Sequence, residues 1–295
     1  RPDRWTHRLN KPKLFLAKRG PRNMSSKSTT PQWRQRLDRI DSPVESIRFP
    51  ELKEVTLDQD EEWCEVVIDG KPRRVRFHDY DKSYRVPGLY EKLFYDRLEC
   101  NSPERVVGLL EDVISDVDDD IEQMRVLDVG AGNGIVGEEL ASCGADKLFG
   151  IDIIPEAKDA ALRDRPDVYD GYMVADLTDF PEQLEERLRR EDLNCLTTVA
   201  ALGYGDIPPR AFIKALDMIS TPGWLAFNIK EDFIAERYNS GFCKLSRQLS
   251  KSEVIQIQAY RRYRHRLSLS GEPLHYVGMV ARKLRDVPDR YLQIQ

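Results

Sequence analysis

The sequence predicts an α/β fold that is doubly wound around a mostly parallel sheet, with an antiparallel C-terminal hairpin and an N-terminal hairpin extension. Three observations support this prediction. Strand-like and helix-like segments alternate from residue 125 to residue 229, a glycine-rich turn follows the first of these strands, and two long strand-like runs come near the end of the chain. Strands alternating with helices of this length are typical of a parallel sheet covered on both faces.

The composition predicts a globular protein that lies outside membranes. Of the 295 residues, 40% are hydrophobic and 33% are charged, and the mean hydropathy is −0.57. This chain is too apolar to be wholly disordered, and no segment approaches the roughly 18 consecutive apolar residues of a membrane helix. We therefore expect the protein not to associate with a membrane.

The cysteine and histidine patterns predict reduced thiols and no metal site. The five cysteines contain no C-x-x-C pair, and the four histidines are scattered without an H-E-x-x-H motif. Widely spaced, odd-numbered cysteines are typical of a cytoplasmic protein, and the ligand spacings of a zinc site are missing. The basic, acid-poor N-terminus leaves a mitochondrial transit peptide open as an alternative.

Residues 1–45 are expected to form a flexible basic arm, the first of three regions. The first 40 residues hold 12 of the 46 basic residues and only two of the 51 acidic ones. Recurring prolines and a polar run at 25–30 favour a solvated arm. Contact with nucleic acid through this arm is the alternative, although no aromatic-basic pattern accompanies it.

Residues 46–100 are expected to form an N-terminal extension with a hairpin and an aromatic lid. Two strand-like runs between Trp63 and Phe77 flank Asp69-Gly70, a strong signal for a tight hairpin turn. An aromatic stretch from His78 to Tyr95 follows.

Residues 101–295 are expected to form the third region, a ligand-binding α/β domain. Its apolar periodicity predicts a helix at 102–117 and then the alternating elements. The predicted strands are 125–129, 147–152, 171–175, 194–200 and 223–229. The predicted helices are 134–142, 155–163, 180–190, 209–219 and 231–250. Residues 254–269 and 274–283 are read as the closing antiparallel hairpin.

The segment Val126–Gly137 reads V-L-D-V-G-A-G-N-G-I-V-G and is the main functional signal. It passes from a buried strand through a glycine turn into a helix. Glycine lets the backbone turn sharply and come close to a ligand, and the N–H groups at the start of a helix attract an anionic group such as a carboxylate.

A dinucleotide site is the competing interpretation, because residues 132–137 also fit G-x-G-x-x-G and Asp152 follows Gly132 by 20 residues. Three features favour a sulfonium ligand instead. Asp128 precedes the first glycine by two residues, where its carboxylate could hold an amino group directly or through water. Asp176 ends a third strand, where it suits an adenine amino group. The C-terminal hairpin is absent from standard dinucleotide domains.

Taken together, these residues resemble the successive cofactor motifs of class I S-adenosylmethionine (SAM)-dependent methyltransferases, over roughly residues 100–285. The resemblance implies a Rossmann-like seven-stranded sheet with an antiparallel last strand and SAM at the carboxyl ends of the strands. It implies that the glycine segment lines the methionine part, Asp152 accepts from both ribose hydroxyls, and Asp176 and Leu177 flank adenine. A helix cap is the alternative role of Asp152. The implied cofactor-binding residues are Asp128, Gly130, Ala131, Gly132, Asn133, Gly134, Asp152, Ile153, Asp176, Leu177 and Ala200.

The acceptor side is expected to lie at residues 200–209 and at the aromatic stretch. The segment A-A-L-G-Y-G-D-I-P-P departs from the Asn/Asp-Pro-Pro-Tyr/Phe box of many amino methyltransferases, which favours a small, partly apolar acceptor with Tyr204 beside it. Tyr80 and Tyr84 are expected to close over the sulfonium by cation–π attraction; packing of the hairpin is the alternative. His78 is the candidate base, because an unperturbed imidazole titrates near pH ~6.5.

Three functions stay open at this point. A small-molecule O-, N- or S-methyltransferase is favoured. An RNA or protein methyltransferase would use the basic arm and a single row formed by Arg262, Arg264 and Arg266 on an edge strand, where positive charge is otherwise ordinary protection against aggregation. A SAM-binding protein without turnover is the third, because one fold hosts many activities.

Overall fold

The computed structural model describes residues 30–51, 57, 61–117, 119–202, 207–231 and 241–292. The described residues from Gln32 onward belong to one compact unit. Most of the predicted flexible arm, residues 1–29, lies outside the described residues. The remainder of that region contains helix α1 (Gln32–Leu37) and the first residues of strand β1 (Val44–Arg48).

A seven-stranded sheet forms the centre of this unit, in the order β6-β5-β4-β7-β8-β10-β9. The first five strands in this order are parallel, and β10 pairs antiparallel with both β8 and β9. The predicted doubly wound sheet with an antiparallel C-terminal hairpin is thus confirmed. The strands are β4 (Arg125–Val129), β5 (Lys147–Asp152), β6 (Gly171–Val174), β7 (Cys195–Thr198), β8 (Gly223–Lys230), β9 (Ile255–Leu267) and β10 (Pro273–Lys283).

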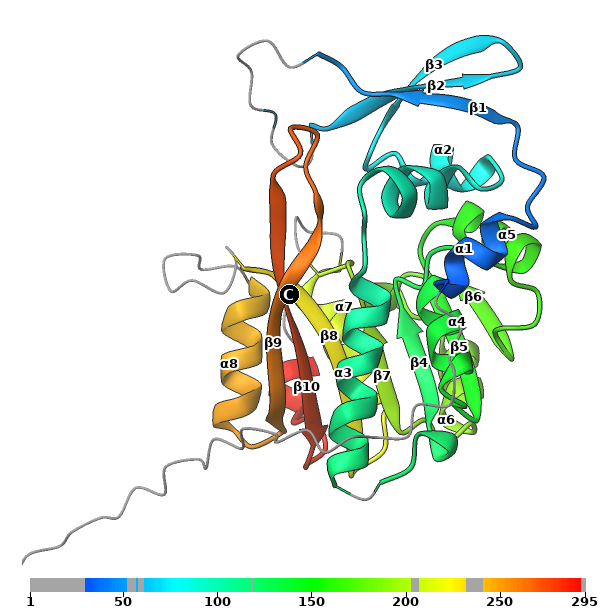
Figure 1. Cartoon of the computed structure of the whole chain (residues 1–295). Helices are drawn as coiled ribbons and strands as arrows, with labels where there is room; N and C mark the ends of the chain where they lie inside the picture. Colours follow the sequence, from blue (N-terminus) through cyan, green and yellow to red (C-terminus); the bar gives the residue numbers. More distant parts are fainter. Residues whose placement is uncertain are drawn as a thin grey trace, which may run out of the picture. The chain divides into compact units, whose positions relative to one another are not determined.

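Helices cover both faces of this sheet (Figure 1). The apolar side chains of α3 and α4 pack on one face, and those of α6, α7 and α8 pack on the other. No helix in the described part of the chain is both long and apolar enough to cross a membrane. The helices are α3 (Ser102–Asp116), α4 (Ile135–Ser142), α5 (Pro155–Asp164), α6 (Glu182–Arg189), α7 (Pro209–Asp217), α8 (Gly241–Lys251) and α9 (Asp289–Leu292), with short 3₁₀ turns η2 (Ile121–Gln123) and η3 (Leu177–Asp179).

Because helices cover both faces of the sheet, the central strands have continuous runs of apolar residues instead of alternating apolar and polar residues. Seven consecutive residues of β8, Gly223–Ile229, are buried, as are the last four of β4. Continuous burial is typical of parallel strands between two helix layers. The polar members of these runs, Asp128 and Asn228, therefore need partners inside the protein.

A second, three-stranded sheet precedes the large one and consists of β1, β2 (Trp63–Ile68) and β3 (Lys71–Arg76). The predicted hairpin is confirmed: Asp69 and Gly70 form its turn with φ values of 51° and 69°, as a tight hairpin turn of type I′ requires. Strand β1, which pairs antiparallel with β2, was not predicted.

Two further helices connect this sheet to α3. They are α2 (Tyr80–Arg85) and the π-helix η1 (Glu91–Arg97). Residues 78–97, which contain both, are called the lid segment below. Buried side chains of η1, Leu93 and Phe94 among them, pack with those of the three-stranded sheet in one apolar cluster.

Strand β9 contains a β-bulge at His265. Leu274 of β10 pairs with Arg266 and the next residue, His275, pairs with Arg264, so His265 is the extra residue. A bulge interrupts the alternation of side chains between the two faces of a strand. Arg264 is consequently exposed, whereas His265 and Arg266 are both buried. The prediction of a single row of Arg262, Arg264 and Arg266 is wrong for Arg266.

The hairpin of β9 and β10 extends past the carboxyl ends of the parallel strands toward the three-stranded sheet (Figure 1). Glu62, immediately before β2, anchors it there. One Glu62 oxygen forms an ion pair with the Arg266 guanidinium, and the other accepts from the N–H of Leu269 at 2.7 Å. Both charged side chains are at most 3% exposed.

Replacing Glu62 by glutamine is expected to lower the free energy of unfolding by about 3–5 kcal/mol, because Arg266 would stay buried without its counter-ion. Glu65→Gln is the matched control, since Glu65 pairs with Arg48 at the surface, 3.5 Å apart, where a pair contributes at most about 1 kcal/mol. Urea unfolding of the two variants measures both values. Equal losses would show that the buried pair does not anchor the hairpin.

Candidate functional site

A cavity of about 250 Å³ lies at the carboxyl ends of β4, β5, β6 and β7. The chain runs from β4 outward to β5 and β6, and then returns to the other side of β4 with β7. Open α/β sheets bind ligands at such a switch point. Every described residue predicted to bind or act on a ligand lines this cavity, apart from Asp128 and Gly134.

The glycine segment forms the floor of the cavity in a conformation that side chains would obstruct. Gly130 and Gly132 have φ values of 70° and 54°, in the left-handed region. A Cβ on Gly130 would lie 2.8 Å from the Cβ of Ala201, and one on Gly132 would lie 2.6 Å from the hydroxyl of Tyr84. Gly134, with φ of 89°, is the N-cap of α4.

Asp152 ends β5 beside this loop. Its Oδ2 accepts from the N–H of Gly132 and its Oδ1 from the N–H of Ile154, both at 2.9 Å. Burial raises the pKa of this carboxyl despite these hydrogen bonds. The bond to Ile154 is a local contact just before α5, whose N-cap is Ile154 and has no side-chain cap, so Asp152 is not the helix cap considered from the sequence. Each oxygen keeps a second lone pair for a ligand.

Asp128 lies below the loop rather than on the cavity wall, and it is 1% exposed. The hydroxyl of Tyr169 donates to its Oδ2 and that of Thr197 donates to its Oδ1, both at 2.7 Å. Burial raises the pKa of Asp128 to about 6, although both hydrogen bonds lower it. A direct contact with a ligand amino group would thus compete with protein partners, and a contact through water stays a prediction.

The ends of β6 and β7 form two further walls of the cavity. Asp176, exposed after β6, accepts from both the N–H and the hydroxyl of Thr178 at 2.7 Å, which lowers its pKa. The next residue, Leu177, is buried. After β7, Ala200 has a left-handed φ of 57°, and its N–H donates to Asn228. Tyr204, the candidate catalytic tyrosine, lies outside the described residues.

Aromatic rings of the lid segment form the roof. His78 stacks on Tyr80 with ring centroids 5.6 Å apart, and Tyr80 stacks on Tyr84 at 6.2 Å. Tyr84 lies 5.0 Å from Tyr90, which lies 4.7 Å from Phe94. These five side chains line the cavity. The tyrosines also pack in apolar clusters with neighbouring side chains, which is the packing role considered from the sequence. Their cation–π role over a sulfonium stays a prediction.

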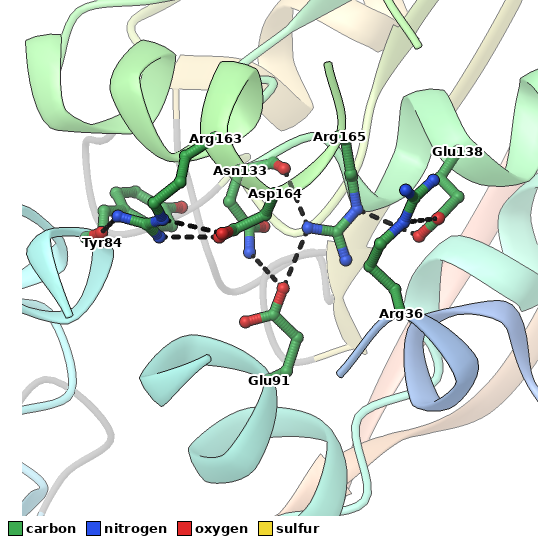
Figure 2. Close-up of polar contacts among 8 residues, drawn as sticks. All are labelled: Arg36, Tyr84, Glu91, Asn133, Glu138, Arg163, Asp164 and Arg165. Atoms are coloured by element: carbon green, nitrogen blue, oxygen red, sulfur yellow. Dashed lines mark hydrogen bonds and ion pairs between the residues drawn. The ribbon is translucent and has the colours of Figure 1, made fainter. Parts of the chain in front are cut away.

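A buried polar cluster fastens the lid segment to the glycine loop (Figure 2). Arg165, at the end of α5, donates to Glu91 of η1 at 2.9 Å, to Glu138 of α4 at 3.0 Å and to the carbonyl of Asn133 at 3.1 Å. The side chain of Asn133 donates to Glu91 at 2.7 Å, and Arg36 of α1 donates to Glu138 at 2.8 Å. The two guanidinium groups are thus neutralised by the carboxylates of Glu91 and Glu138, which offsets the electrostatic cost of burying these charges.

The neighbouring Arg163 makes a second connection to the lid segment. Its guanidinium is held by Asp164 and donates to the carbonyl of Tyr84 at 3.1 Å (Figure 2). The C-terminal end of α5 therefore contacts both α2 and η1. Of the residues drawn in Figure 2, Asn133 and Tyr84 were predicted to belong to the site.

The cavity lining also contains functional candidates that the sequence did not indicate. They are Cys100, His265, Arg266 and Tyr276. The Oγ of Ser102 lies 2.6 Å from the Nδ1 of His265. These residues come from the start of α3 and from the bulged hairpin. A local motif could not have indicated them, because 163 residues separate Ser102 from His265.

The described residues contain no group of three or more His, Cys, Asp or Glu side chains placed to hold a metal ion. The four cysteines described as free thiols are Cys64, Cys100, Cys143 and Cys195. Burial raises the pKa of both Cys64 and Cys195 to about 12, so these two thiols stay protonated and unreactive at neutral pH.

Comparison with known proteins gives similarity in structure alone. No protein-family model matches the sequence, and no curated protein matches it significantly. The solved structure of N-methyltransferase NodS from Bradyrhizobium japonicum WM9, in complex with S-adenosyl-L-homocysteine (SAH), is similar with a TM-score of 0.50 and 16% identity. The match covers 71% of this chain and 98% of that one.

Two further structures are similar at lower scores. Magnesium protoporphyrin IX methyltransferase from Synechocystis PCC 6803, with bound SAM, has 14% identity and a TM-score of 0.43, covering 61% of this chain and 79% of that one. A SAM-dependent methyltransferase from Mesorhizobium loti has 15% identity and a TM-score of 0.43, covering 60% and 96%. The chain therefore has the fold of the class I SAM-dependent methyltransferases.

Proposed function

We propose that this protein is a SAM-dependent methyltransferase that acts on a small molecule. One observation carries the proposal: the glycine loop and Asp152 meet at the switch point of the sheet, beneath a roof of aromatic rings. The loop would approach the methionine part closely, and its backbone N–H groups favour a carboxylate. The cofactors bound to NodS and to the Synechocystis enzyme are of this type.

The residues present fit such a cofactor. Gly130 and Gly132 adopt left-handed φ values and line the cavity, so their backbone is open to close approach by a ligand. Asp152 would accept from the ribose hydroxyls with its remaining lone pairs, and Asp176 and Leu177 would contact adenine at the exposed and buried sides of the same strand end. Bound SAM supplies a sulfonium methyl group that is open to in-line attack.

The chain's own residues would position the reactants and exclude water. Tyr80, Tyr84 and Tyr90 present aromatic faces, which attract a sulfonium by cation–π interaction. Tyr84 lies directly over Gly132. Holding donor and acceptor in line inside this enclosure lowers the entropic part of the barrier, which is often sufficient for displacement from a sulfonium.

The walls support a small acceptor over a macromolecule. The cavity as a whole is lined mainly by apolar and aromatic side chains. The three arginines of β9 that the RNA hypothesis would use have carboxylate partners: Arg262, Arg264 and Arg266 pair with Glu231, Glu99 and Glu62. Paired charges offer less attraction to phosphates than free ones.

Calorimetric titration with SAM, SAH and NAD tests the proposal. We expect micromolar affinity for SAM and SAH without NAD binding, and a loss of about tenfold or more in Asp152→Asn, because a hydrogen bond to a charged acceptor contributes about 1.5–3 kcal/mol. Asp179→Asn is the matched control, since Asp179 is exposed in η3 outside the cavity lining. Binding of NAD alone would identify a dinucleotide site. SAM binding without turnover on any acceptor would indicate a non-catalytic protein.

SAM affinity is expected to decrease as pH falls through about 6. The folded protein without ligand holds the Asp128 proton with a pKa of about 6, so the carboxylate that attracts the ligand's amino group is neutralised below that pH. The loss should approach tenfold for each pH unit, about the limit for one competing proton. Asp128→Asn should bind SAM more weakly at neutral pH and without this dependence. A variant that retains the wild-type profile would assign the titration to another group.

Replacing Arg165 by methionine is expected to lower the free energy of unfolding by about 3–5 kcal/mol, since Glu91 would stay buried without a cation. SAH affinity should fall with it, because the lid segment loses one of its two attachments to the glycine loop and keeps only the hydrogen bond from Asn133 to Glu91. Arg189→Met is the control: Arg189 pairs with Glu185 and Asp217 at the surface, where about 1 kcal/mol or less is expected. Urea unfolding and calorimetry measure the two effects. An Arg165 variant with wild-type SAH affinity would separate the cluster from ligand binding.

A further inference from the structure

The bulge at His265 gives the cavity an unusual pair of neighbours, an imidazole and a guanidinium that are consecutive in sequence. Regular alternation would direct only one of them inward. Both His265 and Arg266 instead line the cavity. Bulges are enriched next to active sites, where they redirect a side chain. The hydrogen-bonding properties of these two side chains therefore help to determine which chemical groups an acceptor molecule can place in the cavity.

Four buried side chains determine where the His265 proton lies. Asn228 is oriented by the N–H of Ala200, which donates to its Oδ1 at 2.6 Å. The Nδ2 of Asn228 is therefore the donor, to the hydroxyl of Tyr263 at 2.6 Å and to the Oγ of Ser102 at 3.2 Å. The orientation of this amide fixes the direction of the bonds that follow.

The next two bonds follow from proton counting. The Tyr263 hydroxyl already accepts from Asn228, and its own proton has one acceptor among the described residues, Ser102 Oγ at 2.8 Å. Ser102 has a single proton left to donate, and His265 Nδ1 lies 2.6 Å away. Nδ1 is therefore an acceptor, and a neutral imidazole with an acceptor Nδ1 has its proton on Nε2.

The surroundings keep this imidazole neutral. Complete burial lowers the pKa of His265 well below 6.5, and the neighbouring Arg266 lowers it further. The other groups packed around the ring are uncharged: Tyr276, with its ring centroid 4.1 Å away, and Cys100, whose Sγ is 3.8 Å from Nδ1. Burial also raises the pKa of the Cys100 thiol, which keeps it protonated. Within the described part of the chain, the polar contacts of the ring are made by Nδ1.

We propose that His265 is the acceptor-binding residue of this site and that its Nε2–H donates a hydrogen bond to an anionic oxygen on an aromatic acceptor, a carboxylate or a phenolate. The inference rests on the proposed methyltransferase function and specifies its substrate class. A donor nitrogen cannot remove a proton from an amine, so the site does not suit protonated amines. Arg266 lines the same cavity but is neutralised by its ion pair with Glu62, so the Nε2–H of His265 is the donor that we assign to the acceptor. The rings of Tyr95 and Tyr276 also line the cavity, where they suit an aromatic acceptor.

The transfer balances without a general base. The anionic oxygen attacks the methyl carbon, an O–C bond forms, the S–C bond breaks, and its electron pair stays on sulfur. His265 keeps its proton throughout and acts by orienting the oxygen. His78, on the lid segment, is then not required as a base for this reaction.

The first arm of the test measures the tautomer. Protein labelled with ¹⁵N in its four histidines is examined by long-range ¹H–¹⁵N NMR, and His265→Gln assigns the resonance by its loss. We expect a bare Nδ1 and a protonated Nε2 from about pH 5 to about pH 8. Ser102→Ala should change the Nδ1 signal. A protonated Nδ1, or a ring that titrates in this range, overturns the proposal.

The second arm measures binding of simple probes to the SAH-saturated protein. Benzoate represents the carboxylate source, and 4-nitrophenol, titrated at a mildly alkaline pH at which it is ionised, represents the phenolate source; benzylamine is the cationic counterpart. We expect benzoate or 4-nitrophenolate to bind better than benzylamine. The preferred anionic probe should bind His265→Phe about tenfold or more weakly, as loss of a hydrogen bond to a charged oxygen predicts. His265→Gln, which keeps an N–H donor, should retain most of the affinity. Tighter binding of benzylamine, or no loss in His265→Phe, overturns the proposal.

Measuring SAH affinity distinguishes failure of the proposed methyltransferase function from failure of the acceptor assignment. Wild-type protein that binds neither SAM nor SAH contradicts the proposed function itself. SAH binding that is normal in the wild type and in both His265 variants shows that the site is folded. Failure of the tautomer or the probe arm then contradicts the acceptor assignment alone.

Discussion

The buried guanidinium of Arg165 is the interaction on which the arrangement of the site depends. A charge in this position is tolerable only because Glu91 and Glu138 neutralise it. One carboxylate comes from the lid segment and the other from the helix behind the glycine loop. Because the buried guanidinium needs both carboxylates, the lid segment and α4 must be in place together around Arg165. The aromatic roof is held over the cavity as a consequence, and apolar packing alone would have left its position less well determined.

The parts of the fold that follow from local chemistry could be predicted from the sequence. Asp69-Gly70 specifies its hairpin turn through backbone conformation, and the apolar run of β8 identifies a strand buried on both faces. Strand β1 was missed because a short edge strand depends on its partner for stability rather than on its own sequence. The bulge was missed because an extra residue in a strand has no composition of its own; only the pairing with β10 reveals it.

The same distinction holds for the site. Gly130, Gly132 and Asp152 were found because turn geometry and strand ends leave a pattern over about 20 residues. The buried position of Asp128 below the loop could not be predicted from a local pattern. Its hydrogen-bond partners Tyr169 and Thr197 are 41 and 69 residues away in the sequence. His265 looked like part of an exposed basic run. Its burial depends on Ser102 and Asn228, which no periodicity connects with it.

The bulge in β9 also has an evolutionary consequence. Deleting one residue there would restore regular pairing and turn one side chain of the pair from the cavity to the solvent, while the flanking strand kept its register. A substitution replaces a side chain in its position, whereas this deletion would withdraw either the imidazole or the guanidinium from the cavity wall and restore regular pairing in a single step. Changes in strand length could thus alter this wall of the cavity without any change in the glycine loop.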